Sequence, residues 1–315
     1  MFSTFSVWLR VIRFRFLAAS AIAVTAGMAL SYWYQPNGFN VFFAFLTYLG
    51  IFCLHSSVDL LNDYWDYKRG IDLITKKTKF SGGTGVLPEG LLTPHEVYRA
   101  GLLFLAFGLL IGIYFVFVKG YVVGLILGFA TLSIVLYSTK LVNFGLGELF
   151  VGIKGALIVI GSLYVQTSNL MLGSVIAGIV IGLLSSLVLF INSIPDVRAD
   201  KEKGRKTLAI ILEDHKISKT FAFVSGFFVS IYLLTAVFYF SVLNNALLII
   251  PSLFLIPLGI TILVRFNAYL RQDKNNIDFS YYEKIMEKTV LFSRLYGLSI
   301  VVGILMLCVG RYINK

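Results

Sequence analysis

Nine apolar segments, each long enough to cross a bilayer as a helix, constrain the fold of this chain more than any other feature. A transmembrane helix needs about 20 mainly apolar residues, and the chain supplies such runs at 16–34, 41–61, 97–118, 120–138, 147–167, 171–193, 219–242, 244–264 and 290–311. These runs are too long for the alternating strands of about ten residues that membrane barrels use. Only 14% of the 315 residues are charged, against about 25% in soluble domains. We therefore expect an all-α integral membrane protein with about nine transmembrane helices.

The distribution of charge predicts how these helices are oriented. Most of the 27 Lys and Arg residues precede the first apolar run, lie in the long loops at about 63–96 and 194–218, or fall between 265 and 294. Basic residues concentrate on cytoplasmic loops, so we expect the N-terminus and both long loops to be cytoplasmic and the C-terminus to lie outside the cell membrane. The net charge of +11 is explained by this bias and by affinity for anionic lipid headgroups or phosphorylated substrates. No nucleic-acid partner is needed to account for it.

The chain shows no boundary between domains, so we expect residues 1–315 to form a single membrane domain whose active site is built by the two long loops. A short pattern recurs within it. Asn62-x-x-x-Asp66 and Asn192-x-x-x-Asp196 each follow an apolar run, with four predicted helices between them. This spacing suggests two four-helix halves with the character of a pseudo-repeat, plus a ninth helix.

The segment LLNDYWDYKRGID, residues 60–72, places polar side chains at the end of an apolar run. In a helix, Asp59, Asp63 and Asp66 fall within about 60° of one face. Gly70 is expected to end that helix. The sequence therefore predicts one face crowded with acidic groups at the cytoplasmic end of the second span.

A second polar cluster follows the sixth apolar run. Asn192, Asp196 and Asp200 stand at i, i+4 and i+8, so a continuous helix would stack them on one face. Pro195 favours a break or a new helix start at this point.

Two such clusters facing each other predict a magnesium site. Carboxylates this close stay ionised only beside a compensating charge, and Mg²⁺ takes hard oxygen ligands while it bridges substrate phosphates. Metal ions there would stabilise negative charge on a departing pyrophosphate, and a lipid diphosphate would place its tail among the helices. The predicted metal ligands are Asn62, Asp63, Asp66, Asp72, Asn192, Asp196 and Asp200.

These motifs resemble the UbiA superfamily of intramembrane prenyltransferases. NDYWDYKRGID looks like its first aspartate-rich motif, N-D-x-x-D-x-x-x-D, except that Gly70 holds the last position and the acid falls at Asp72. This displaced form resembles the branch that prenylates 1,4-dihydroxy-2-naphthoate, the MenA type. Further similar stretches are WLRVIRFRFL (8–17), FSGGTGVLPEGLLTP (80–94), YSTKLVNFGLGE (137–148) and NSIPDVRADKEKGRKTLA (192–209).

The resemblance implies a helix bundle around a central cavity and a Mg²⁺-dependent transfer. A polyprenyl group would pass from its diphosphate to an aromatic acid, with loss of carbon dioxide, in menaquinone biosynthesis. Catalytic roles would fall on Asp66, Asp196, Tyr137 and Lys140, and substrate binding on Arg13, Asn62, Lys68, Lys79, Asn192, Arg198, Arg205 and Lys206. The chain departs from the family at Asp59, where Asn is common, and this places an extra acid beside the site.

Three other interpretations remain open. An ion-coupled transporter would also use membrane acids, but transporters tend to place them near the bilayer midplane. A CDP-alcohol phosphotransferase would need a D-G-x-x-A-R signature, which the sequence lacks. A geranylgeranylglyceryl-phosphate transferase of ether-lipid synthesis would share the metal site and prenylate a phosphorylated glycerol instead.

Three polar residues inside or near apolar runs have no assigned role. His55 lies one turn before Asp59, and a hydrogen bond to a neighbouring helix is a simpler interpretation than a metal ligand. Glu148 and Lys154 are six residues apart and do not share a helix face, which argues against a pair between them. Charges at such positions are usually functional or mutually neutralised.

Overall fold

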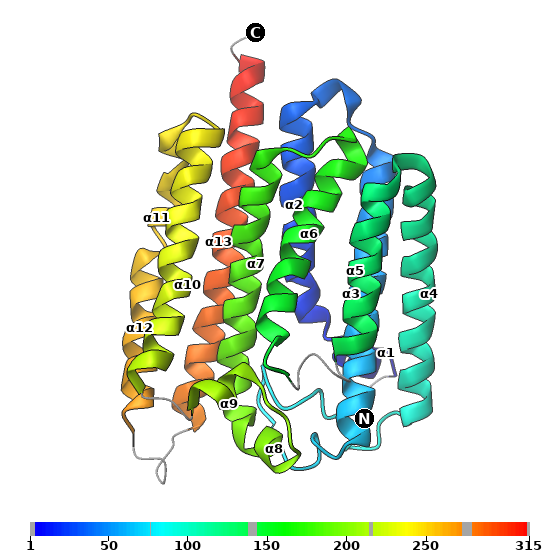
Figure 1. Cartoon of the computed structure of the whole chain (residues 1–315), viewed down its shortest axis with the longest axis vertical. Coiled ribbons are helices and arrows are strands. Elements are labelled where there is room, and N and C mark those ends of the chain that lie inside the picture. Colours follow the sequence, from blue (N-terminus) through cyan, green and yellow to red (C-terminus); the bar gives the residue numbers. More distant parts are fainter. Residues whose placement is uncertain (1–3, 76, 138–143, 214–216, 273–278, 314–315) are drawn as a thin grey trace.

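The computed structural model describes residues 4–75, 77–137, 144–213, 217–272 and 279–313. Within these ranges the protein is built of helices and contains no strands, and the long helices run side by side as a bundle (Figure 1). The helices are α1 Thr4–Val11, α2 Phe14–Tyr34, α3 Val41–Lys68, α4 Pro94–Lys119, α5 Tyr121–Tyr137, α6 Gly147–Thr167, α7 Leu172–Ser193, α8 Val197–Glu202, α9 Leu208–Glu213, α10 Ile217–Val237, α11 Ile250–Leu253, α12 Ile256–Leu270 and α13 Phe279–Ile313.

The prediction of an all-helical membrane protein is confirmed. Among the described residues, seven helices are long and apolar enough to cross a membrane, and the number is eight if the pair Ala246–Leu253 and Ile256–Leu270, bent by 43°, counts as one span. The shorter apolar α5 accounts for the remaining predicted run. The protein is thus a multi-pass membrane protein. The internal repeat of four helices stays a prediction.

The second span extends further than the apolar run that predicts it. The run ends at residue 61, whereas α3 continues to Lys68, so the first long loop begins near residue 69 and not near 63. The helix ends in a Schellman motif: Gly70 has a φ of +71°, its N–H donates to the Tyr67 carbonyl, and the Ile71 N–H donates to the Asp66 carbonyl. An apolar run predicts only the lipid-embedded part of a helix. Residues 62–68 of α3 are more polar and extend beyond that part.

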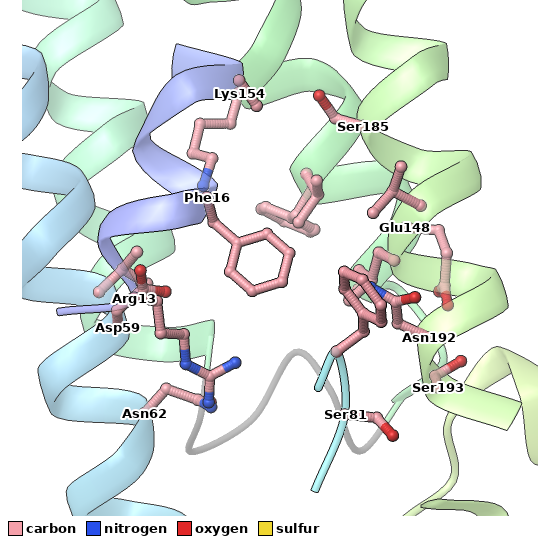
Figure 2. Close-up of a pocket in the computed structure, with 18 of the residues that line it drawn as sticks. Arg13, Phe16, Asp59, Asn62, Ser81, Glu148, Lys154, Ser185, Asn192 and Ser193 are labelled. Carbon is pink, nitrogen blue, oxygen red and sulfur yellow. The ribbon is translucent and has the colours of Figure 1, made fainter. Parts of the chain in front are cut away.

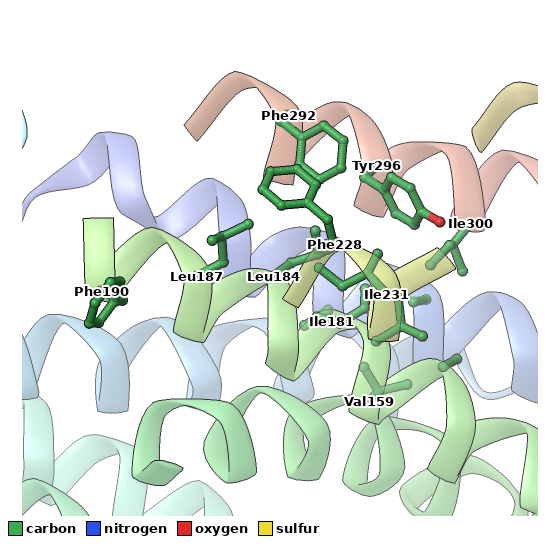
Figure 3. Packing of buried hydrophobic residues seen from close by; sticks show 14 of the residues in the cluster. Val159, Ile181, Leu184, Leu187, Phe190, Phe228, Ile231, Phe292, Tyr296 and Ile300 are labelled. Carbon is green, nitrogen blue, oxygen red and sulfur yellow. The ribbon is translucent and has the colours of Figure 1, made fainter. Parts of the chain in front are cut away.

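Close contact between α6 and α7 fixes the centre of the bundle. A Cβ on Gly182 would lie 2.2 Å from the Gly152 carbonyl oxygen, so this position leaves room only for glycine. Small residues that let two backbones approach are a common device in membrane helix packing. The adjoining core, drawn in Figure 3, is formed with α2, α10, α12 and α13 and includes Phe190, Phe228 and Tyr296.

The polar segments gather at one end of the bundle. α1, α8 and α9 lie at this end, and α13 runs to the opposite end (Figure 1). Large apolar side chains such as Phe117 and Leu125 stay exposed along the sides, as expected for a surface that faces lipid. The fold therefore brings both long loops to the same face of the membrane.

Candidate active site

The polar face of α3 forms one wall of a cavity at this end of the bundle. Asp59, Asn62 and Asp66 line it, and the Asn62 side-chain N–H donates to Asp66 across 3.3 Å. The i, i+4 spacing of the last two follows directly from the helix. Asp63, on the same helix, does not line the cavity and is bound by other residues, described below.

The opposite wall comes from the end of α7 and the turns that follow it. α7 ends at Ser193, residues 194–196 form a 3-10 turn that begins around Pro195, and α8 starts at Val197. Asn192, Asp196 and Asp200 all line the cavity in spite of this change in helix type. The expected break at the proline is confirmed.

Both polar clusters thus face a single cavity with a volume of about 320 Å³. Figure 2 shows Asn62 and Arg13 on one side and Asn192 on the other. Asp72, from the loop after α3, also lines it, as do Ser81, Gly82 and Gly83 of the glycine-rich stretch. Sequence segments 130 residues apart therefore meet as their shared pattern suggests.

Arg205 connects the two clusters directly. Its guanidinium forms an ion pair with Asp66 on α3 and lies 3.2 Å from the Asp200 carboxylate on α8. Burial alone would lower the pKa of Arg205, but the two carboxylates outweigh burial and raise that pKa above its usual value. A fixed positive charge therefore stands between the acidic groups.

Arg13 holds the remaining acid of the first motif. Its guanidinium donates to Asp63 at 2.7 Å, and the Thr84 hydroxyl donates to the other Asp63 oxygen. Arg13 has a φ of +49° at the junction between α1 and α2, and this sharp turn points α2 into the bundle. The Asp63 carboxylate of the first motif therefore binds both the junction between α1 and α2 and the glycine-rich loop, residues 81–85.

A second set of charges fastens the loop to the N-terminal helix. Arg10 on α1 makes two hydrogen bonds with the Glu89 carboxylate, at 2.6 and 2.8 Å, and Lys77 also pairs with Glu89. Arg10 Nε donates to the Thr84 carbonyl at 2.8 Å. Hydrogen bonds from Arg10 and Lys77 lower the pKa of Glu89 to about 2. The carboxylate therefore remains ionised, and the loop remains attached, at neutral pH.

Asp72 lies in a strongly acidic setting. Burial, followed by the nearby Asp63 and Asp66, raises the pKa of the Asp72 carboxyl to about 8. A Cβ on Gly83 would clash with both Asp72 carboxylate oxygens at 2.6 Å, so the loop glycine permits this approach. Gly82 and Asp196 line the same cavity, which brings the same loop to the second motif.

The oxygen atoms around the cavity fit Mg²⁺ by their chemistry. Asn192 Oδ1 and Asp196 Oδ1 are buried and have no hydrogen-bond partner among the residues that the structure describes, and buried polar atoms in that state are unusual. Among the described residues no three His, Cys, Asp or Glu side chains converge tightly enough to hold one ion, and Arg205 separates two of the acids. The donors match a magnesium site in which Asn and substrate oxygens complete the coordination.

Several basic residues predicted to bind substrate lie outside the cavity lining. Lys68 packs against the rings of Tyr64 and Trp65, and Lys79 lies 3.8 Å from Glu287. The Arg198 side chain is 93% exposed and pairs with Glu202; Lys206 is exposed as well. Lys140 and the side chain of Tyr137 lie outside the part of the chain that the structure describes. The roles given to these residues stay predictions.

The structure also adds residues that motif reasoning left without a role. Ser20, His55, Asp59, Glu148 and Lys154 all line the cavity. The signal for four of them was present in the sequence, because ionisable residues within apolar spans are rare and usually face a bundle interior. Ser20 is an ordinary small residue of a transmembrane run and carried no such signal.

A second, mostly apolar cavity of about 120 Å³ adjoins the first. It runs among α3, α4, α5 and α6, and its lining includes Gly50, Leu54, Gly112 and Gly161. The two cavities share the lining residues Ser20, His55, Val58, Ile134, Lys154 and Ile158. The first cavity is the more polar of the two and is called the polar cavity below, and it meets the apolar cavity at this common boundary.

The sequence is similar to that of proteins named 1,4-dihydroxy-2-naphthoate octaprenyltransferase. It is 30% identical to the one from Bacillus subtilis over 62% of each chain, so the match spans about three fifths of that relative. It is also 30% identical to the one from Haemophilus influenzae, over 67% of this chain and 70% of the relative.

The fold is similar to solved structures of UbiA homologues. One from Aeropyrum pernix K1 superposes with a TM-score of 0.64 at 15% identity, covering 90% of this chain and 97% of that one. A homologue from Archaeoglobus fulgidus, solved with DMAPP and Mg²⁺ bound, gives 0.61 at 14% identity, covering 94% and 99%. At these identities the likeness establishes the shared fold.

The sequence of residues 20–287 matches the UbiA prenyltransferase family. This region contains both aspartate-rich motifs, the glycine-rich loop and Arg205, which the structure gathers around one cavity. The match favours an enzyme over the transporter interpretation. The chain belongs to the UbiA prenyltransferase family.

Proposed function

We propose that this protein transfers a polyprenyl group from an allylic diphosphate to 1,4-dihydroxy-2-naphthoate, with loss of carbon dioxide, as a step of menaquinone biosynthesis. The observation that carries the proposal is the meeting of the two acidic motifs around one cavity that adjoins an apolar chamber. The naphthoate acceptor is supported by the 30% identical relatives and by the G-x-D form of the first motif. The whole of residues 1–315 acts as one membrane domain.

The diphosphate would bind between the two acidic motifs. Arg13 and Arg205 supply guanidinium groups to this region, and such groups bind phosphate oxygens with charge-assisted hydrogen bonds. The acidic side chains Asp66, Asp72, Asp196 and Asp200, with Asn62 and Asn192, would hold Mg²⁺ there. When bound, Mg²⁺ neutralises the diphosphate and stabilises the charge of the leaving pyrophosphate.

The prenyl tail would enter the apolar cavity between α3 and α6. Its lining of aliphatic and aromatic side chains suits an isoprenoid chain, and exclusion of water protects a developing allylic cation. Phe16 and Phe80 line the adjacent polar cavity and offer aromatic faces that favour a cation. The allylic carbon would thus lie where the two cavities meet.

The transfer itself balances without an added proton. The allylic C–O bond breaks and leaves its electron pair on the pyrophosphate. The ring carbon that carries the carboxylate forms the new C–C bond with the allylic carbon. The bond between that ring carbon and the carboxylate then breaks, its electrons restore the aromatic ring, and carbon dioxide leaves.

We propose the orientation that the charge distribution predicts. α1, the two long loops and the cavity would face the cytoplasm, where a charged diphosphate and a soluble aromatic acid are available. The opposite end of α13 would face outward. Positive charge near the cytoplasmic side would also attract anionic lipids.

The test is the release of labelled carbon dioxide. Purified protein is supplied with Mg²⁺, geranylgeranyl diphosphate and 1,4-dihydroxy-2-naphthoate labelled in its carboxyl carbon, and the gas and the prenylated naphthol are measured. Release that EDTA abolishes is the expected result. Prenylation of geranylgeranylglyceryl phosphate in place of the naphthoate would assign the protein to ether-lipid synthesis, and inactivity on both acceptors across several prenyl lengths would overturn the proposal.

A further inference from the structure

Lys154 lies inside a membrane-spanning helix and lines a cavity, a position where a lysine without a functional role is rare. It is on the third turn of α6, inside a membrane span, and its side chain lines both the polar and the apolar cavity. Among the described residues its ammonium has no hydrogen bond or ion pair, although Asp59 acts on it electrostatically. Charges inside a membrane span are costly and mark functional sites by default.

Lys154 is part of a small polar cluster at the boundary of the two cavities. His55 Nδ1 and the Ser20 hydroxyl are 2.6 Å apart, and His55 Nε2 lies 3.6 Å from Asp59 Oδ2. That Asp59 oxygen is buried and accepts no hydrogen bond from any residue that the structure describes. Figure 2 shows the Lys154 side chain extending from α6 toward the part of the cavity where Phe16 and Asp59 lie.

The cluster is separate from the diphosphate groups. Asp59 lies almost two helical turns before Asp66 on α3, and Lys154 is on a helix that carries neither aspartate-rich motif. Because the allylic carbon joins a charged head to an apolar tail, it must lie near the boundary between the cavities. The polar groups at that boundary therefore face the second substrate, which has to approach the allylic carbon.

We propose that Lys154 binds the carboxylate of the aromatic acceptor, and that Asp59 and His55 orient the ammonium and the acceptor ring. This inference rests on the proposed function. The ammonium is the one cationic group at this boundary among the described lining residues that has no partner of its own; Arg13 is already paired with Asp63. The carboxylate of the acceptor would form the ion pair that the Lys154 ammonium lacks among the described residues.

The site also explains the acid at position 59. Lys154 and Asp59 attract each other across the cavity, so Asp59 keeps the ammonium near the boundary before the acceptor arrives. A neutral side chain at position 59 would leave the Lys154 ammonium without this counter-charge inside the membrane span. Asp59 is thus a positioning residue, and Lys154 is the binding residue.

The experiment compares two acceptors in binding and in turnover. Equilibrium binding of labelled 1,4-dihydroxy-2-naphthoate is measured in detergent with EDTA present, for wild type, Lys154→Met and Lys154→Arg. The same is done with 1,4-dihydroxynaphthalene, which lacks the carboxylate. Lys119→Met is the matched control, because Lys119 lies at the opposite end of α4 from the polar loops and lines neither cavity.

The expected result is selective. Lys154→Met weakens binding of the carboxylated acceptor by about 10- to 100-fold, the range for losing a hydrogen bond to a charged group, and leaves the diol unchanged. Its KM for the prenyl diphosphate stays at the wild-type value, and Lys154→Arg restores much of the lost affinity. Lys119→Met behaves as wild type with both acceptors.

Other outcomes overturn the inference or the proposed function separately. Equal weakening of acid and diol, or a raised KM for the diphosphate, would show that Lys154 does not recognise the carboxylate. If the wild-type protein binds the acid but does not prenylate it, the proposed function is refuted. The binding role of Lys154 is still supported in that case when Lys154→Met loses affinity for the acid. Absence of wild-type binding to the acid would overturn both.

Discussion

Arg205 forms an ion pair with Asp66 although 139 positions separate the two residues in the chain. The side chains are only 9% and 11% exposed, and the same guanidinium also reaches Asp200. The pair therefore joins the two halves of the proposed metal site while it neutralises acids that would otherwise repel each other.

Removing this charge should destabilise the metal-free protein. Arg205→Met leaves the two buried carboxylates without their guanidinium partner, a change that costs about 3 kcal/mol or more. The apparent Tm in detergent with EDTA should fall clearly, and Mg²⁺ with a prenyl diphosphate analogue should restore part of it. Arg198→Met is the control, since its exposed pair with Glu202 contributes less than about 1 kcal/mol. An unchanged Tm for Arg205→Met in EDTA would contradict the bridging role.

Loss of one acid from either motif should stop transfer without unfolding the protein. Asp66→Asn and Asp196→Asn keep the size of the side chain but remove a negative ligand from the proposed metal site. We expect kcat to fall by about 100- to 1000-fold, as for the loss of other groups that stabilise transition-state charge. Initial rates at saturating Mg²⁺ measure this, with Glu202→Gln on the exposed face of α8 as control. Full activity in either motif variant would refute the metal assignment.

Magnesium binding should depend on pH through Asp72. The pKa of this carboxyl is raised to about 8, chiefly by burial, so the metal-free protein keeps a proton on Asp72 below that pH. Mg²⁺ must displace this proton, and its apparent affinity should rise by up to about tenfold per pH unit until about pH 8 and then level off. Binding titrations by calorimetry measure the slope, and Asp72→Asn should flatten it.

The same shift gives the opposite sign for stability without metal. The folded state binds the Asp72 proton more tightly than the unfolded state does, so raising the pH from about 4 to about 8 weakens the metal-free fold. Thermal unfolding in EDTA across this range should show a decline that Asp72→Asn reduces. A wild-type slope that the substitution leaves unaltered would assign the decline to other groups.

Filling the apolar cavity should shorten the prenyl chain that the enzyme accepts. Gly161 lines this cavity, and a Cβ there would lie 3.5 Å from Ile126, an ordinary contact. Gly161→Leu therefore adds volume inside the cavity without forcing the helices apart. Competition between long and short prenyl diphosphates, read by chromatography of the products, should shift toward the shorter chain. Gly128→Leu is the control, because that position is open and outside the lining.

Much of the fold followed from the sequence because hydrophobicity and helix geometry act locally. The apolar runs identified the membrane helices, and the positions of Asp59 and Asp66 on one face of α3 followed from the helical repeat. Asp63 shares that face in a helical projection, yet Arg13 and Thr84 bind it away from the cavity. Those contacts depend on the turn between α1 and α2 and on the loop conformation, which no local pattern encodes.

The positions of the basic side chains were also poorly predicted from the sequence. Lys68, Lys79 and Arg198 stand next to the motifs in sequence, but their side chains turn to aromatic rings or to exposed acids. Lys154 is far from both motifs in sequence and still lines the cavity. Nearness along the chain therefore predicted the position of the acids, which are fixed on helix backbones, better than that of long flexible cations.

α3 lines both cavities along one continuous helix, from Gly50 and Leu54 in the apolar chamber to Asp66 in the polar one. The helix therefore fixes the distance between the groups that line the two cavities. Each residue advances it by about 1.5 Å and turns it by about 100°, so the separation between the diphosphate end and the far wall of the tail chamber is set by residue count. Inserting one residue between these parts would rotate the acids away from the cavity and abolish function. Under the proposed function, product length would therefore change through the side chains that fill the apolar cavity, while the spacing along α3 stays the same.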